Sequence, residues 1–203
     1  MKKIIIMLCV LLLLVASLAV MSSCGGTTET TTEATTTTEP IVTTQMVVTT
    51  TLPETTKSSV PKGYAVYNNN SISFVYPEHF VKQGDKTTVI LQDEKTGNNV
   101  TVTAEKMTNE YFQMDRNDYK ETLKPAFEAA GMRIGDYSVA QVKNEKGVAI
   151  AKIWHKITLN GQSMYQTMLV VNSNNKTYTV TITEIVPDSE LVNNVFESLY
   201  RPS

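Results

Sequence analysis

The side chains best suited to covalent or metal chemistry are few in this 203-residue chain. It has two cysteines, Cys9 and Cys24, and two histidines, His79 and His155. Both cysteines precede residue 25, so no thiolate can act as a nucleophile or metal ligand in the rest of the chain. The sequence patterns of zinc proteases, serine hydrolases, phosphate loops and dinucleotide folds are absent. We therefore expect no catalytic, cofactor-binding or metal-binding residues and a protein that is not an enzyme.

The histidines and paired acids have structural explanations. His155 falls on the same predicted sheet face as Ile153, Ile157 and Gln166, which predicts a packed, hydrogen-bonded histidine rather than a catalytic base. A metal site that used both histidines would need carboxylate ligands that the sequence does not place beside them. Asp93-Glu94 lacks the spacing of a calcium loop and indicates a solvated turn.

Trp154 is the only tryptophan and stands between Lys152 and Lys156. An exposed aromatic residue flanked by cations is typical of a contact surface. A lone tryptophan in a strand more often packs in the core. We expect Trp154 in the core, with the contact surface as the alternative.

The N-terminus has the pattern of an export signal. Lys2 and Lys3 precede an apolar run of 17 residues, Ile4 to Val20. That run is shorter than the about 20 residues of a membrane-spanning helix. The segment that follows, Met21-Ser22-Ser23-Cys24-Gly25-Gly26, resembles the bacterial lipobox.

The lipobox resemblance implies that the Cys24 sulfur receives a diacylglyceryl group and that residues 1–23 are a lipoprotein signal peptide. Acyl chains such as palmitate on Cys24 would then anchor the protein to membrane lipid at the extracytoplasmic face. The alternative is ordinary cleavage after Ala19, which would release a soluble protein.

Residues 24–61 are rich in threonine and are predicted to be a disordered stalk. Sixteen of the 30 residues from 27 to 56 are Thr. So few apolar side chains cannot offset the conformational entropy of folding. The stalk would span on the order of 35 Å as a flexible coil.

Residues 62–203 are predicted to be one domain with many strands. Alternating segments predict strands at 71–76, 87–92, 98–107, 135–143, 147–159, 162–172 and 176–186. Two-residue turns at Asn160-Gly161 and Asn174-Asn175 make the second half an antiparallel meander.

Two helices are predicted beside these strands. Asp115 can cap the first, with Asp118 in its first turn; Pro125 should kink or shorten it, and Gly131 ends it. The second follows Pro187, with Asp188 or Ser189 as its cap. Its apolar stripe comprises Leu191, Val192, Val195, Phe196 and Leu199.

The Asn160-Gly161 hairpin pairs Leu159 with Gln162 and sorts the neighbouring side chains onto two faces. Both faces carry apolar residues, so each needs a cover. The expected fold is therefore α+β, a mainly antiparallel sheet flanked by helices in an α/β/α sandwich.

Several of these segments together resemble the PsbP-like fold. They are the Ser71–Glu78 and Gly97–Val102 strands, the helix ending at Ala130-Gly131, the Tyr178–Thr183 strand and the Phe196–Leu199 end of the last helix. The similarity covers most of residues 64–200 and implies a non-enzymatic module that binds a partner.

The predicted function combines these features: a membrane-anchored lipoprotein that presents a binding domain on a flexible stalk. Its partners would be membrane lipid, through Cys24, and an envelope or membrane protein of unknown identity. From residue 62 onward 15 basic residues face 16 acidic ones, which excludes a nucleic-acid footprint. The alternatives are a solute-binding lipoprotein that serves a transporter and a cell-envelope enzyme.

Overall fold

The structure is a computed structural model that describes residues 60–85 and 87–202. The predicted signal peptide, Cys24 and the stalk as far as residue 59 lie outside the described residues. Within this part of the chain, no helix is long and apolar enough to cross a membrane.

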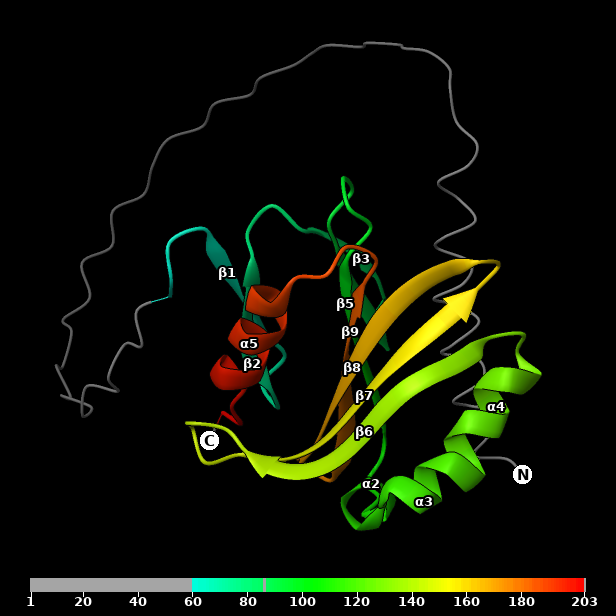
Figure 1. Cartoon of the computed structure of the whole chain (residues 1–203). Helices are drawn as coiled ribbons and strands as arrows, with labels where there is room; N and C mark the ends of the chain where they lie inside the picture. The colour runs from blue at the N-terminus through cyan, green and yellow to red at the C-terminus, as the bar shows by residue number, and fades with distance from the viewer. Residues whose placement is uncertain (1–59, 86, 203) are drawn as a thin grey trace, which may run out of the picture.

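A seven-stranded antiparallel sheet forms the centre of the domain (Figure 1). In spatial order its strands are β3 (Val81–Gly84), β4 (Thr88–Gln92), β5 (Asn99–Lys106), β9 (Lys176–Glu184), β8 (Gln162–Ser173), β7 (Ala149–Leu159) and β6 (Arg133–Lys143). The central strands β5, β7, β8 and β9 bury residues on both faces, whereas the edge strand β3 is exposed throughout. The predicted antiparallel meander is confirmed.

The two predicted hairpin turns fix the register of β7, β8 and β9. Asn160 and Gly161 have φ values of 51° and 83°, and Asn174 and Asn175 have 48° and 59°. Two consecutive turn residues in the left-handed backbone conformation suit the right-handed twist of the strands that they join. Leu159 pairs with Gln162 as expected, and Ser173 pairs with Lys176.

A separate hairpin of β1 (Tyr64–Asn68) and β2 (Ser73–Pro77) lies beside the main sheet. The sequence predicted β2 but neither β1 nor the short edge strand β3. Tyr67 stacks on Phe74 with their ring centroids 4.9 Å apart. The hairpin contacts the end of the chain, where the Ser198 hydroxyl accepts a hydrogen bond from the Val75 N–H at 2.9 Å.

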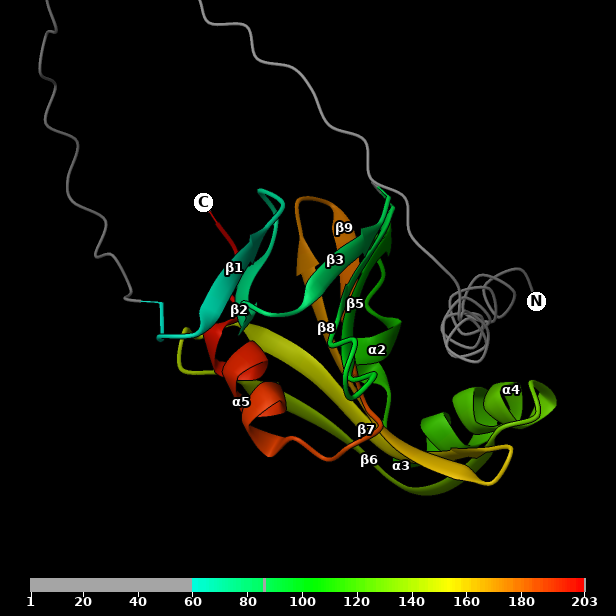
Figure 2. The ribbon, with the colours of Figure 1, turned by 90° about the horizontal axis from the view of Figure 1, so that it is seen from above.

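Helix α5 (Ser189–Ser198) covers one face of the sheet together with this hairpin (Figure 2). The Asp188 side chain caps it by accepting the Leu191 N–H at 3.0 Å. Leu191, Val195 and Leu199 are buried, as the apolar stripe predicted. On the sheet the same core includes Val100, Ile150, Leu169, Val180 and Ile182.

The helical segment against the opposite face is broken into short pieces. They are α2 (Glu110–Gln113), α3 (Arg116–Asp118), the π-helical turn η2 (Tyr119–Leu123) and α4 (Lys124–Ala129). Asp115 and Asp118 form a capping box, which confirms the predicted cap. Pro125 lies in the first turn of α4, directly after the π turn. Because proline has no N–H to donate, the regular hydrogen bonding is interrupted there.

The second apolar core lies between these helices and β6, β7 and β8. It contains Tyr119, Leu123, Phe127, Met132, Ile134, Ile153, Ile157, Met164 and Met168. On the same face β9 carries Thr181 and Thr183, which are buried but belong to neither apolar core. The α+β class with a mostly antiparallel sheet is confirmed, and the full α/β/α sandwich stays a prediction.

Candidate ligand-binding groove

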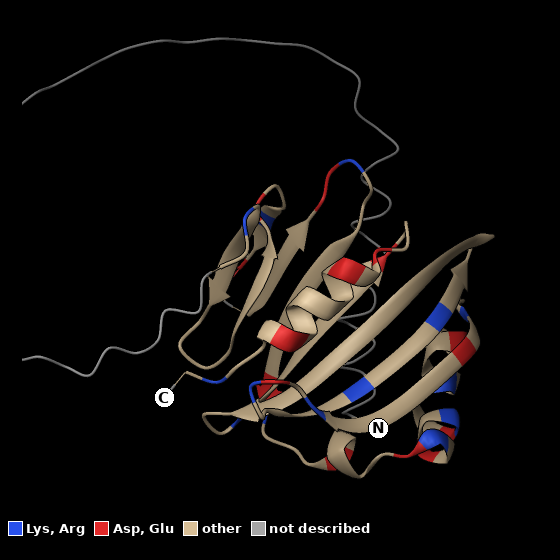
Figure 3. Ribbon diagram, turned by 60° about the vertical axis from the view of Figure 1, so that its left-hand side comes forward, with Lys and Arg blue, Asp and Glu red and all other residues tan. Residues whose placement is uncertain are grey.

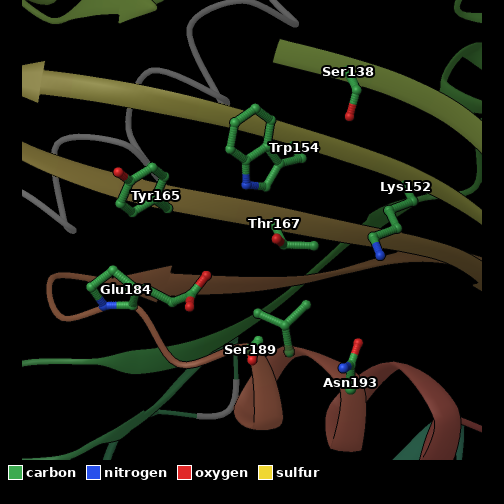
Figure 4. A pocket seen from close by; sticks show the side chains of 10 residues that line it. Ser138, Lys152, Trp154, Tyr165, Thr167, Glu184, Ser189 and Asn193 are labelled. Atoms are coloured by element: carbon green, nitrogen blue, oxygen red, sulfur yellow. The ribbon is translucent and has the colours of Figure 1, made fainter. Parts of the chain in front are cut away.

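A groove of about 480 Å³ lies between the sheet and the first turns of α5 (Figure 4). Its walls come from β6, β7, β8, β9 and α5, and it includes Lys152, Trp154, Tyr165, Thr167, Glu184 and Asn193. The ten residues of α5 extend about 15 Å, whereas the twelve of β8 extend about 40 Å. The helix therefore cannot cover the whole sheet face, and the groove begins where its cover ends.

Two aromatic side chains form one wall. Trp154 on β7 and Tyr165 on β8 have nearly parallel rings, 17° apart in plane, with centroids separated by 6.2 Å. Both are half-buried, and neither belongs to an apolar core. The expectation that Trp154 packs in the core is therefore wrong. Its side chain points to the same sheet face as that of Ile150, but it lines the groove beside α5 and stays half-buried.

Two lysines flank Trp154 on the same sheet face. The Lys152 Nζ lies 4.9 Å from the centroid of the Phe196 ring, and the Lys156 Nζ lies 5.7 Å from that of Tyr165. Each ammonium thus sits against the negative face of a ring. Figure 3 shows both basic and acidic positions among the described elements in view.

Glu184 is the acid of the groove and is 6% exposed. Its Oε1 accepts the Asp188 N–H at 2.6 Å, and among the described residues no hydrogen bond occupies Oε2. Burial raises the pKa of the Glu184 carboxyl, and the nearby Asp188 charge raises it further. Figure 4 shows its side chain on the groove side of β9, below Thr167. A buried carboxylate with a free oxygen can accept a hydrogen bond from a ligand.

Sequence reasoning missed Glu184 and Tyr165 as site residues. Glu184 continues the alternation of Tyr178, Val180 and Ile182, so it places a charge at the end of a core stripe. That interruption of an apolar face was the available signal. Asp188 was predicted as a helix cap, but its N–H contact with Glu184 depends on the path of the chain between β9 and α5.

His155 lies on the opposite face of the sheet and is completely buried. Its Nδ1 lies 2.9 Å from the Tyr119 hydroxyl, and its Nε2 lies 3.0 Å from the Gln166 Oε1. Because an amide oxygen only accepts, Nε2 carries the proton and Nδ1 accepts from Tyr119. Burial lowers the pKa of His155 to about 4. The predicted packed, hydrogen-bonded histidine is confirmed.

The remaining polar residues singled out from the sequence have local roles. Asp93 accepts hydrogen bonds from the Thr96 hydroxyl at 2.7 Å and the Lys95 N–H at 2.9 Å, as in a turn. These bonds, that from Thr96 above all, lower the pKa of Asp93. His79 Nε2 lies 3.8 Å from Asp93 Oδ2 at the surface. Over residues 60–85 and 87–202, no group of three or more potential ligands could hold a metal ion.

Comparisons with known proteins give distant likenesses to solved structures. No protein-family model matches the chain, and no curated protein matches it. A solved structure from Bacteroides thetaiotaomicron VPI-5482 is 13% identical, with a TM-score of 0.44, over 65% of this chain and 45% of that one. The chain thus spans less than half the length of the Bacteroides protein.

A second solved structure is LpqN of Mycobacterium tuberculosis, described as involved in cell envelope biogenesis. It is 10% identical, with a TM-score of 0.40, over 69% of this chain and 91% of LpqN. Identities and TM-scores this low indicate at most a partial likeness of fold. The resemblance to the PsbP-like fold stays a prediction.

Proposed function

We propose that this protein is an extracytoplasmic lipoprotein whose folded domain binds a component of the cell envelope through the groove beside α5. The observation that carries the proposal is a buried carboxylate, Glu184, that faces a groove walled by the half-buried rings of Trp154 and Tyr165. In an unliganded domain the half-buried rings leave apolar surface in contact with water, and the Glu184 oxygen without a partner among the described residues is left to bond water. A ligand that covers the rings would remove this apolar surface from water, and its donor groups could replace water at the acid.

Binding fits the groove better than catalysis does. Glu184 is the one carboxylate among the residues that line the groove. Hydrolysis of a glycosidic bond generally requires two carboxylates that flank the bond, and acyl transfer requires a nucleophile with an adjacent base. The imidazole of His155 is sealed on the other face of the sheet. These features support the non-enzymatic module that the PsbP-like resemblance implies.

The membrane anchor of the proposal rests on the sequence. Two or three acyl chains on Cys24 would hold the protein at the bilayer almost permanently, at about 0.8 kcal/mol for each buried methylene group. The stalk would let the domain search tens of ångströms around its anchor and would raise the local concentration of the groove near envelope ligands. Shortening residues 27–56 should then impair function in cells but leave the affinity of the groove unchanged.

Capture of a small solute for a transporter is the second candidate. Its support is the groove volume of about 480 Å³, which falls within the range of small-molecule pockets, roughly 300 to 1,000 Å³. A solute carrier would bind a free monomer as tightly as a polymer of that monomer, whereas an envelope-binding protein would prefer the polymer. Comparing the two affinities therefore separates solute capture from envelope binding.

A retention assay tests the proposed groove. The lipidated chain, purified in detergent, is incubated with washed envelope fragments, and the bound fraction is measured for wild type, Trp154→Ala and Tyr165→Ala. We expect both variants to lose most of their retention. Phe112→Ala, which truncates a half-buried aromatic side chain on α2 at the opposite face, is the matched control. Equal retention of all four proteins would contradict a binding role for the groove.

A further inference from the structure

The charges at the groove argue against a ligand with strong net charge. Lys152 and Lys156 flank Trp154, and each of their ammonium groups already lies against an aromatic ring. An organic cation would meet both lysines and would compete with them for the ring faces. An anion would meet the buried carboxylate of Glu184, whose charge is already disfavoured by burial. A neutral, polar ligand avoids both conflicts.

The polar groups that line the groove are mixed donors and acceptors. Lys152 can only donate, the free oxygen of Glu184 accepts when ionised, and the Thr167 and Ser189 hydroxyls and the Asn193 amide can do both. A ligand that satisfies them all must carry several groups that donate and accept at short spacing. Sugar hydroxyls have this property, whereas an apolar ligand would leave these groups unpaired.

The aromatic wall has the geometry to bind the apolar side of a sugar ring. One face of a pyranose presents axial C–H groups and packs flat on an aromatic ring. The Trp154 and Tyr165 rings are nearly parallel, with centroids 6.2 Å apart, and Figure 4 shows them side by side with their flat faces turned the same way, so they present one extended aromatic surface. The groove is open beside the first turns of α5, where Ser189 and Asn193 line it (Figure 4). A chain of sugar units can lie along such a surface.

We propose that the groove binds a neutral saccharide, with sugar rings against Trp154 and Tyr165 and hydroxyl groups bonded to Glu184 and Lys152. This inference rests on the proposed binding function and gives it a ligand class. The same chemistry is offered by a glycan polymer of the envelope and by a free sugar. The groove favours the polymer, because it is open along the sheet rather than enclosed.

The protein carries its own reporter for the test. Trp154 is the only tryptophan of the chain, so the intrinsic tryptophan fluorescence comes entirely from the groove. The full chain in detergent is titrated with N-acetylglucosamine tetramer, maltohexaose and laminarihexaose and with the corresponding monosaccharides. A glycan array of neutral oligosaccharides extends the search. We expect saturable spectral changes and reduced quenching by acrylamide with at least one oligosaccharide, and at least tenfold weaker binding of its monosaccharide.

Variants assign the binding to the groove, with calorimetry as the readout where the tryptophan is lost. Glu184→Gln keeps the shape but removes the charged acceptor, and should weaken binding about tenfold to a hundredfold. Trp154→Ala should weaken it at least tenfold, and Trp154→Phe much less, because a ring remains. The matched control for charge is Glu121→Gln on the opposite side of the sheet. Circular dichroism at 25 °C checks that each variant is folded.

The outcomes distinguish the ligand class from the groove itself. If no neutral saccharide binds while envelope retention still depends on Trp154, the saccharide assignment is overturned and the groove remains the binding site. Binding of oligolysine or of a deglycosylated envelope protein that depends on Glu184 also overturns it. If Trp154→Ala and Glu184→Gln bind a saccharide as tightly as the wild type does, the assigned contacts are wrong and the groove is not the binding site. Equal affinity for monomer and oligomer would identify a free sugar as the ligand.

Discussion

Acid should destabilise the domain chiefly through one buried side chain, His155. The imidazole is fully buried and neutral in the fold, with Tyr119 donating to Nδ1 and Gln166 accepting from Nε2. Protonation would require Nδ1 to give up the bond from Tyr119 and would place a charge beside Phe127, whose ring centroid is 4.8 Å away. Burial lowers the pKa of His155 from 6.5 to about 4.

The sign and size of the effect follow from proton linkage. Between these two pKa values the unfolded chain binds a proton that the folded chain does not, so the free energy of unfolding falls as the pH falls. From pH 8 the loss should reach about 2 kcal/mol at pH 5 and approach about 3 kcal/mol near pH 3. The full contribution of His155 to stability is therefore present only above its unfolded pKa.

Urea unfolding from pH 4 to pH 8 measures this loss, and a difference between two proteins isolates it from other titrating groups. His155→Gln removes the titration but keeps an amide that can donate to Gln166. The stability difference between wild type and His155→Gln should shrink by about 2 kcal/mol from pH 8 to pH 5. Tyr119→Phe tests the hydrogen bond separately and should cost about 1 to 3 kcal/mol at pH 8, because it leaves Nδ1 buried without a donor.

Nuclear magnetic resonance on the wild type gives an independent check, because it follows the protonation of His155 directly. The chain has two histidines, so the C2 proton signals are few and can be assigned with His155→Gln. The His155 signal should stay in the neutral position down to about pH 5. A His155 signal that titrates between pH 6 and pH 7, or a stability difference that does not change with pH, would refute the reasoning.

The other predictions concern the groove, the core turns and the anchor. Burial raises the pKa of Glu184, so its ionisation should lower the free energy of unfolding as the pH rises above the pKa of the unfolded chain, about 4.5. Glu184→Gln should therefore gain stability relative to wild type between pH 4 and pH 8. A stability difference that stays constant over this range would contradict the prediction. Asn98→Ala should lower the free energy of unfolding, measured in urea, by about 3 kcal/mol, because the Asn98 side chain accepts from the N–H groups of Ile185 and Val186 and donates to the Val186 carbonyl. A loss below about 0.5 kcal/mol would be inconsistent with those hydrogen bonds. Cys24→Ser should abolish acyl labelling and leave an unprocessed precursor, since a hydroxyl is a much weaker nucleophile than a thiolate; an unlipidated wild-type chain that begins at Val20 would disprove the anchor.

The sequence alone determined the elements whose signals are local. Alternation predicted β2 and β4 to β9 within two residues of their observed bounds. Asn-Gly and Asn-Asn pairs set the register, because left-handed turns suit those residues. The stripe and cap of α5 were also readable, since both repeat over one or two helical turns. These features depend on neighbours in sequence and need no knowledge of distant contacts.

The tertiary structure decided the role of each side chain by deciding what covers it. Ile150 and Trp154 point to one sheet face, yet α5 buries the first and leaves the second in a groove, because the helix is shorter than the strand it lies on. Glu184 lines the groove because the chain turns after β9 and enters α5, which places the Asp188 N–H against the Glu184 carboxylate. The hydrogen-bond partner of His155, Tyr119, lies 36 residues away in the sequence. The pattern along one strand determines which face a residue occupies, but burial, and with it pKa and binding capacity, depends on which distant element packs there.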